Sequence, residues 1–203
     1  MNKSASRETY HHGALAEAIL ERARVVLRET GPDELSLRSL ARDLGVSHQA
    51  PYRHFESREA LLEAIALGGF EELIESLERA LRGAGADAHR RFMAAGMAYV
   101  DFASSNPAEY ELMLGRRIDD ASVSAIAAAA QRAFQILIDI VEEGQAEGRY
   151  LMEPARRLAT GAWAMVHGIA TLMNNRALAV PESERVEFVR SILMSAERGV
   201  MHG

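Results

Sequence analysis

Apolar side chains recur along this chain every three or four residues, which is the spacing of one face of an α-helix. Stretches in which β-branched and aromatic residues alternate with polar ones are missing, and Pro and Gly fall between the periodic segments. The pattern predicts an all-α protein of about nine helices. They cover residues 12–30, 37–44, 47–55, 57–82, 87–105, 107–114 and 120–147, and the last two begin at residues 154 and 181.

Helix length divides the chain into two parts. Two short predicted helices follow the first one, and a long helix then leads away from them into a series of longer segments. A length of 203 residues suits a small domain joined to a larger one. We expect a head at residues 1–56 and a helical body at residues 57–203.

Composition excludes several classes of protein. The chain has no Cys, so it has neither a disulfide framework nor a zinc site built on sulfur, and we expect no metal and no cofactor. The first thirteen residues are polar, and no stretch approaches eighteen apolar residues in a row. We expect a soluble, cytoplasmic protein without a membrane partner.

The net charge of −6 is unevenly distributed. Residues 1–60 hold nine basic and nine acidic residues, and the remainder holds 14 basic and 20 acidic ones. The body therefore carries the whole excess. A neutral head can still bind phosphates through helix termini and a few well-placed donors.

The segment from Ser36 to Phe55 has the pattern of a helix-turn-helix. Ser36 caps the first short helix, and Gly45 allows the positive φ that a tight turn requires. The second helix would display Ser47, His48, Gln49, Tyr52 and Arg53 to base edges and phosphates, while Phe55 anchors its end in the core. A helical hairpin that only packs against its neighbours is the alternative.

Four strings at fixed spacings extend this pattern. They are Tyr-His-His-Gly at 10–13, Ser-Leu-Arg-x-Leu-Ala at 36–41, Gly-Val-Ser-His-Gln-Ala-Pro-Tyr-Arg-His-Phe at 45–55 and Ser-Arg-Glu-Ala-Leu-Leu at 57–62. Together they resemble the amino-terminal DNA-binding domain of the TetR family of bacterial transcriptional regulators. The resemblance implies a dimeric repressor that binds a double-stranded DNA operator and is released by a small inducer bound to its C-terminal domain.

The resemblance also implies which residues touch DNA. These are Ser36, Arg38, Ser47, His48, Gln49, Ala50, Tyr52, Arg53, His54 and Arg58. Tyr52 and Arg58 resemble the family's phosphate contacts, and Arg58 lies in the first turn of a helix, where free N–H groups favour an anion. His54 suits either a phosphate contact or a cap. Arg58 stands where the family usually has Lys, and Pro51 where it more often has Leu, so we expect a distorted first turn in the second helix.

The last helix predicts a partner helix. Its apolar residues Val186, Val189, Leu193 and Val200 follow a narrow heptad-like stripe, and the preceding helix is apolar along Leu158, Met165 and Ile169. Packing within one chain would satisfy both stripes. We expect instead that two copies form a four-helix bundle in a twofold homodimer, which implies a palindromic operator.

The string Trp163-x-x-x-His167-Gly168 resembles the C-terminal domain of a TetR subgroup named for those three residues, Trp-His-Gly. Trp163 and His167 share one helix face. With Met93, Met97, Met113 and Phe134 they form the predicted lining of the inducer site; ordinary core packing is the alternative.

Gly68-Gly69 suggests a hinge in the long fourth helix, or else close packing there. Two other functions compete with the ligand-released repressor. One is a DNA-binding dimer without a small-molecule ligand, and the other is an all-helical enzyme, although no nucleophile–base set or metal-ligand spacing organises its acidic residues.

Overall fold

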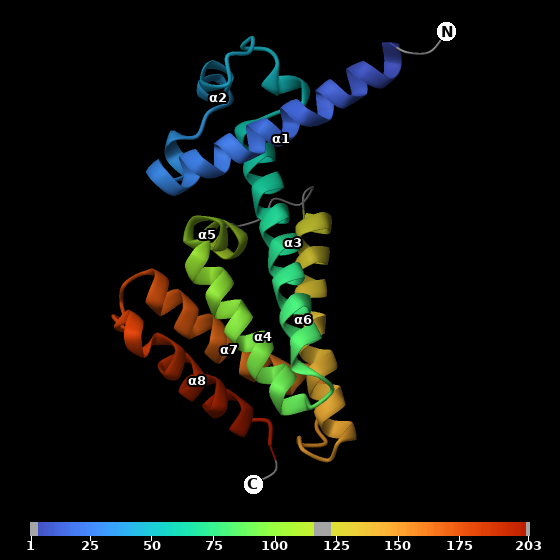
Figure 1. The fold of residues 1–203 in the computed structure, drawn as a ribbon, viewed down its shortest axis with the longest axis vertical. Coiled ribbons are helices and arrows are strands. Elements are labelled where there is room, and N and C mark those ends of the chain that lie inside the picture. Colours follow the sequence, from blue (N-terminus) through green and yellow to red (C-terminus); the bar gives the residue numbers. More distant parts are fainter. Residues whose placement is uncertain (1–3, 116–122, 202–203) are drawn as a thin grey trace. The chain divides into compact units, whose positions relative to one another are not determined.

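The computed structural model describes residues 4–115 and 123–201. Within them it contains eight α-helices, no β-strand, and one isolated bridge between Tyr150 and Met201, so the all-α prediction is confirmed (Figure 1). The helices are α1 (Ser4–Thr30), α2 (Leu37–Asp43), α3 (Arg58–Ala84), α4 (Ala88–Ser105), α5 (Pro107–Gly115), α6 (Val123–Ala146), α7 (Ala155–Asn174) and α8 (Glu182–Arg198). Two 3₁₀ turns, η1 (Pro32–Glu34) and η2 (Pro51–Arg53), complete the set.

Of the nine predicted helices, the one at residues 47–55 is not an α-helix. Its backbone bonds mostly join residues three apart, as between Ala50 N and Ser47 O at 2.9 Å and between His54 N and Pro51 O at 2.9 Å. Pro51 has no N–H to give to the carbonyl four residues earlier, and it begins η2 instead. The effect of this proline is therefore larger than the distorted first turn that we expected.

The chain forms two compact units whose boundary differs from the expected one after residue 56. The first unit combines Met1–Gly69 with Ala108–Ile126, and the second combines Phe70–Pro107 with Ala127–Gly203. Helix α5 therefore belongs with the head, as does the first part of α3. Both α3 and α6 are continuous helices that contribute residues to both units.

In the first unit, α1 contacts α2 and both 3₁₀ turns. The residues that this packing buries are the periodic apolar ones, and they include Ile19, Ala23, Leu27, Leu37, Leu40, Leu61 and Ile65. Arg22 adds an ion pair, since its Nη2 lies 2.8 Å from Asp43 Oδ2 at the end of α2. The head thus has its own apolar core.

Helix α5 is attached to the rest of the first unit by two contacts. Glu109, whose side chain is only 4% exposed, accepts a hydrogen bond from Arg28 Nη1 at 3.1 Å. A Cβ on Gly69 would lie 2.7 Å from Met113 Sδ, so this glycine makes room for the methionine. The buried carboxylate of Glu109 joins α5 to α1, and the space beside Gly69 lets Met113 of α5 pack closely on α3.

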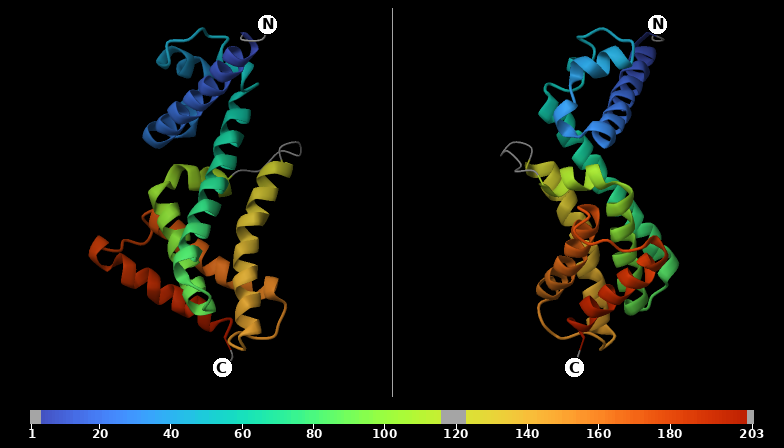
Figure 2. Two further views of the ribbon diagram at one scale, coloured as in Figure 1. Left: turned by 45° about the vertical axis from the view of Figure 1, so that its right-hand side comes forward. Right: turned by 90° about the vertical axis from the view of Figure 1, so that its left-hand side faces the viewer.

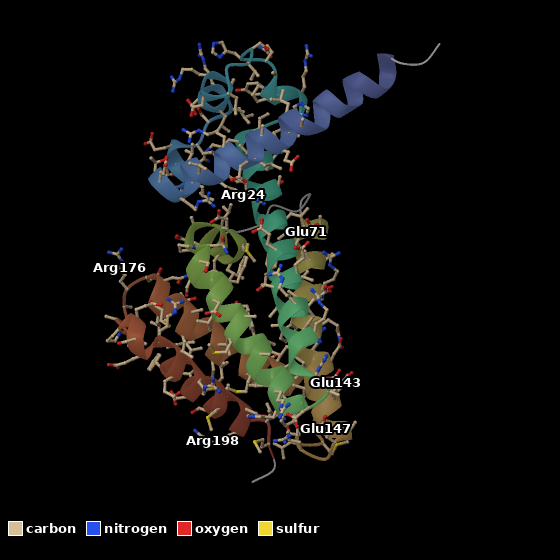
Figure 3. The ribbon with its side chains drawn as sticks, viewed as in Figure 1. Arg24, Glu71, Glu143, Glu147, Arg176 and Arg198 are labelled. Carbon is tan, nitrogen blue, oxygen red and sulfur yellow. The ribbon has the colours of Figure 1, made fainter. Side chains whose placement is uncertain are left out.

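The glycine pair has a packing role. A Cβ on Gly68 would lie 2.6 Å from Nη2 of Arg24, which is labelled in Figure 3, and α3 runs through both glycines without interruption. These contacts support close packing, the alternative to a hinge. Hinge motion remains a prediction.

In the second unit α4, α7 and α8 pack against one another, as Figures 1 and 2 show. Small residues let them approach closely: Gly96 of α4 meets the side chain of Leu193 from α8, and Ala162 and Ala170 of α7 are buried. Leu193 itself is fully buried. These three helices form the core of the unit.

One end of the second unit is organised around Tyr150. Its ring is fully buried against Gly144 and meets Phe92 edge-on, with ring centroids 6.3 Å apart. Its hydroxyl donates to Glu197 Oε1 at 2.8 Å, and His89 Nδ1 lies 2.7 Å from the other oxygen of that carboxylate. Burial and the neighbouring carboxylate raise the pKa of Tyr150 far above its ordinary value, so the phenol stays a donor.

Two further glutamates join the helices at this end. Glu143 and Glu147 lie near the C-terminal end of α6 (Figure 3). Glu147 accepts the backbone N–H of Ala88, the first residue of α4, at 3.2 Å, and Glu143 forms an ion pair of 2.6 Å with Arg91. The start of α4 is thereby tied to the end of α6.

The Gly144 contact leads to a stability prediction. Replacing Gly144 with Ala should destabilise the protein by about 1–3 kcal/mol, because the new methyl group overlaps the buried ring of Tyr150. The matched control is Gly83→Ala, where a Cβ meets nothing within 4 Å and the change should stabilise α3 by up to about 1 kcal/mol. Urea unfolding of both variants measures the difference. Equal effects in the two variants would contradict the packing described here.

Candidate nucleic-acid interface and aromatic cluster

The segment that follows η1 is built to hold a short helix and a turn firmly. Ser36 has extended backbone angles, and its Oγ accepts the N–H of Ser39 at 3.1 Å, which caps α2. Gly45 has a φ of 67°, and the next residue, Val46, donates its N–H to Ala41 O at 3.0 Å. This bond closes the turn after α2, as the predicted role of Gly45 requires.

The polar and apolar residues of this segment lie on opposite sides. Leu37, Leu40, Ala41, Pro51 and Phe55 are buried. Seven of the residues predicted to touch DNA are exposed, namely Ser36, Arg38, Ser47, His48, Gln49, Tyr52 and Arg53, and Tyr52 is 48% exposed. Ala50 and His54 are half-buried. We call the exposed set the reading surface; its side chains point outward although the turn that bears most of them is not an α-helix.

Arg58 differs from the other predicted DNA contacts. Its guanidinium donates to the carbonyl oxygens of Leu35, at 3.1 Å, and Pro32. The side chain is 33% exposed. Two of its N–H donors therefore form hydrogen bonds within the head.

The second unit contains a cluster of aromatic rings from three helices. Trp163 and His167 of α7 stack with centroids 5.1 Å apart, and Phe134 of α6 meets Trp163 edge-on at 6.1 Å. Tyr99 of α4 places its hydroxyl 3.3 Å from His167 Nδ1, and Arg156 lies 5.5 Å from the centre of the Phe134 ring. Burial lowers the pKa of His167, so its imidazole is neutral at pH 7.

Of the six predicted ligand residues, Phe134, Trp163 and His167 lie together in this cluster. At about 100° per residue, Met93 and Met97 project from α4 roughly 120° and 160° away from Tyr99, which faces the cluster. Met113 is buried in the first unit beside Gly69. Helical periodicity alone could not show which face of α4 meets α7.

Two residues of the cluster were not predicted from the sequence. Tyr99 and Arg156 have no motif of their own, and they join the cluster only through the packing of α4 and α6 on α7. A Cβ on Gly168 would meet nothing within 4 Å among the described residues.

Most residues of the predicted dimer interface are buried within the chain itself. Leu158, Ile169, Val189, Leu193 and Val200 are buried in the chain's own core, because α7 and α8 pack on α4 and on each other. Of the predicted interface residues only Met165, 42% exposed, and Val186, 57% exposed, remain accessible. Leu172 and Met194 are exposed large apolar residues on the same two helices.

Two features are absent from the described part of the chain. No three His, Asp or Glu side chains there lie together as a metal ion would require. None of the described helices is both long enough and apolar enough to span a bilayer.

Comparisons with known proteins agree with this architecture. Residues 19–65 match the family model of bacterial regulatory proteins of the tetR family, and residues 92–194 match that of the tetracyclin repressor-like C-terminal domain. The chain belongs to the TetR family of bacterial regulatory proteins. The Trp-His-Gly subgroup remains a prediction.

Individual relatives are consistent with the family. A protein of unknown function from Rhodococcus sp. RHA1 has 40% identity and a TM-score of 0.85, over 95% of this chain and 98% of that one. The TetR family transcriptional regulator PfmR from Thermus thermophilus shares the fold, with a TM-score of 0.71 and 22% identity over 91% of this chain and 99% of its own. An HTH-type transcriptional regulator of Mycobacterium bovis is 31% identical over 64% of this chain, but the match spans only 57% of its length.

The buried position of His167 predicts a pH effect. Its folded pKa lies below the ordinary 6.5, so the unfolded chain takes up a proton first as the pH falls below 6.5. This residue should therefore lower the free energy of unfolding progressively below pH 6.5 until the folded pKa is passed, and it should have no such effect above pH 7. Trp163 is the chain's one tryptophan, and its fluorescence should change in the same titration because the rings stack.

The control for this titration is His167→Gln, which removes the titrating ring. The fluorescence change below pH 6.5 should disappear in this variant. A change of the same size and midpoint in both proteins would contradict the assignment to His167.

Proposed function

We propose that this protein is a sequence-specific DNA-binding transcriptional regulator, a repressor that leaves a palindromic operator when a small molecule binds. The exposed reading surface carries the proposal. Its donors and acceptors face outward while the apolar side of the same segment is buried, which is what a helix-turn-helix needs to enter a groove of duplex DNA. Membership of the TetR family supports the same function.

A homodimer is the second part of the proposal. Met165 and Leu172 lie seven residues apart on α7, with Gly161 and Gly168 at helical spacing beside them, and a Cβ on either glycine would meet nothing within 4 Å. Open glycines next to exposed apolar side chains would allow a helix of a second copy to approach closely. Val186 and Met194 extend the apolar surface onto α8. This face replaces most of the interface that periodicity predicted.

The aromatic cluster is the proposed ligand site. Trp163, Phe134 and neutral His167 offer flat apolar surface with a few polar atoms, which suits an uncharged planar molecule. The same rings also pack against one another in this structure, as side chains of an ordinary core do. The alternative function is therefore a DNA-binding dimer without a small-molecule ligand, and ligand-dependent release of DNA distinguishes the two.

Selection of bound duplexes from a random pool tests the DNA-binding function. The recovered sites should be palindromic. Replacing Arg38 with Ala should weaken binding about 10- to 100-fold and relax the preference at one position of each half-site, if Arg38 reads a base edge. Tyr52→Phe should weaken binding with the preference unchanged, because a phosphate contact positions the protein without reading sequence.

The control is Arg176→Ala, an exposed arginine of the second unit that is labelled in Figure 3. Its affinity and selected sequence should match those of the original protein. Recovery of no preferred sequence by the original protein would refute the proposed function.

Introducing a charge on this apolar face tests the dimer. Met165→Glu should convert the dimer to monomers in sedimentation experiments, because it places a charge in an apolar interface. The matched control is Met152→Glu, since Met152 is 76% exposed and lies between α6 and α7, outside the proposed face. Monomers in the unaltered protein, or dimers in both variants, would show that this face is not the interface.

A further inference from the structure

Arg58, the first residue of α3, uses one edge of its guanidinium on backbone carbonyls. Nε donates to Leu35 O at 3.1 Å, and Nη2 donates to Pro32 O. These two nitrogens lie on the same edge of the planar group, so the side chain holds two fixed acceptors at once. Pro32 O also accepts the N–H of Leu35 at 3.2 Å, and Arg58 thereby braces the η1 turn.

The surroundings of Arg58 are unfavourable for a DNA phosphate. Asp33 Oδ1 lies 3.6 Å from Nη2, and Glu59 Oε1 lies 3.5 Å from Nη1, so two exposed carboxylates lie beside the guanidinium. A phosphate placed beside it would be repelled by both.

The N-terminus of α3 is also occupied. Ser57 Oγ accepts the N–H of Ala60 at 3.1 Å. A hydrogen bond from its own backbone lowers the pKa of Glu59, the acidic residue of this first turn. The N–H groups of Glu59 and Ala60, two of those that could bind an anion at this helix end, are therefore satisfied within the chain.

The carbonyls that Arg58 holds lie directly before the reading surface. Leu35 is 1% exposed, and the next residue is Ser36, which caps α2. Arg38 follows in the first turn of that helix and is exposed. The guanidinium thus links the start of α3 to the residue from which α2 begins.

We propose that Arg58 is a positioning residue for DNA recognition. It holds the start of α2 against the start of α3 so that Ser36 and Arg38 meet the duplex in a fixed register, and it does not contact a phosphate itself. This inference rests on the proposed DNA-binding function. It also explains what an arginine supplies here, since a single ammonium group cannot span both carbonyls with the same rigid geometry.

The test measures the affinity of the dimeric full chain for its selected duplex as a function of salt, with Arg58→Lys and Arg58→Gln. If Arg58 positions α2, both variants should lose affinity by about tenfold, and the slope of log affinity against log salt should stay unchanged. If Arg58 binds a phosphate, Arg58→Gln should reduce the slope by about 0.9 for each phosphate that is no longer neutralised, and Arg58→Lys should bind nearly as well as the original protein. The second pattern would overturn the proposal.

A double-mutant cycle separates positioning from a general loss of stability. If Arg58 acts through α2, the loss from Arg58→Lys should largely vanish when Arg38 is already Ala, whereas a loss caused by unfolding would add to it. Arg42→Lys and Arg42→Gln serve as controls. Arg42 is also in the head, 76% exposed, with Asp43 3.9 Å away, and its variants should keep the original affinity. Additive losses at residues 38 and 58 would overturn the proposal.

The two claims can fail separately. If the unaltered protein binds no preferred duplex, the proposed function fails, and the role of Arg58 fails with it. If the unaltered protein binds its duplex and Arg58→Lys binds equally well, only the positioning role is wrong.

Discussion

The reading surface depends on the burial of the opposite side of the same short segment. Between Ser36 and Phe55 the chain has only one α-helix of seven residues, which would not be stable alone in water. It holds its shape because Leu40, Ala41 and Phe55 pack into a core shared with α1, and because α1 contacts both α2 and η2. The energy that orders the polar residues therefore comes from apolar contacts on the far side.

The same principle governs α7 and α8. Each helix carries more apolar residues than its contacts within the chain bury. The residues that pack around α4, such as Leu193 and Val189, are almost fully buried. What remains exposed is a smaller set around Met165 and Val186. An interface between copies must be made from this remainder, so the protomer's own core decides which residues a partner can meet.

The sequence predicted helices well because their apolar period is a local property, and each of the eight α-helices falls within or overlaps a predicted segment. It also predicted which side of residues 36–55 would be polar. The α-helix predicted at residues 47–55 is wrong, because the backbone there forms turns and the 3₁₀ turn η2, which begins at Pro51. Pro51 lacks the N–H that an α-helix would bond to the carbonyl four residues earlier.

Other sequence predictions concern partners that periodicity cannot identify. A stripe such as Val189 and Leu193 shows that a helix needs a neighbour, but not whether the neighbour belongs to the same chain. Met93 and Met97 were grouped with Trp163 by residue type, whereas the packing of α4 on α7 selects Tyr99. Arg58 was assigned by position in a motif, and its contacts with Leu35 and Pro32 depend on a turn that no spacing rule encodes.

The network around Tyr150 has a consequence for how α8 could associate. Glu197 in the last turn of this helix is bound by the phenol and by His89, and Leu151 N donates to Val200 O at 2.8 Å just beyond the helix. These bonds anchor the C-terminal end of α8 within the chain, so Met194, which lies less than one turn from Glu197, is held in place before any partner binds. A second molecule would find its binding surface already ordered, and association would lose little conformational entropy.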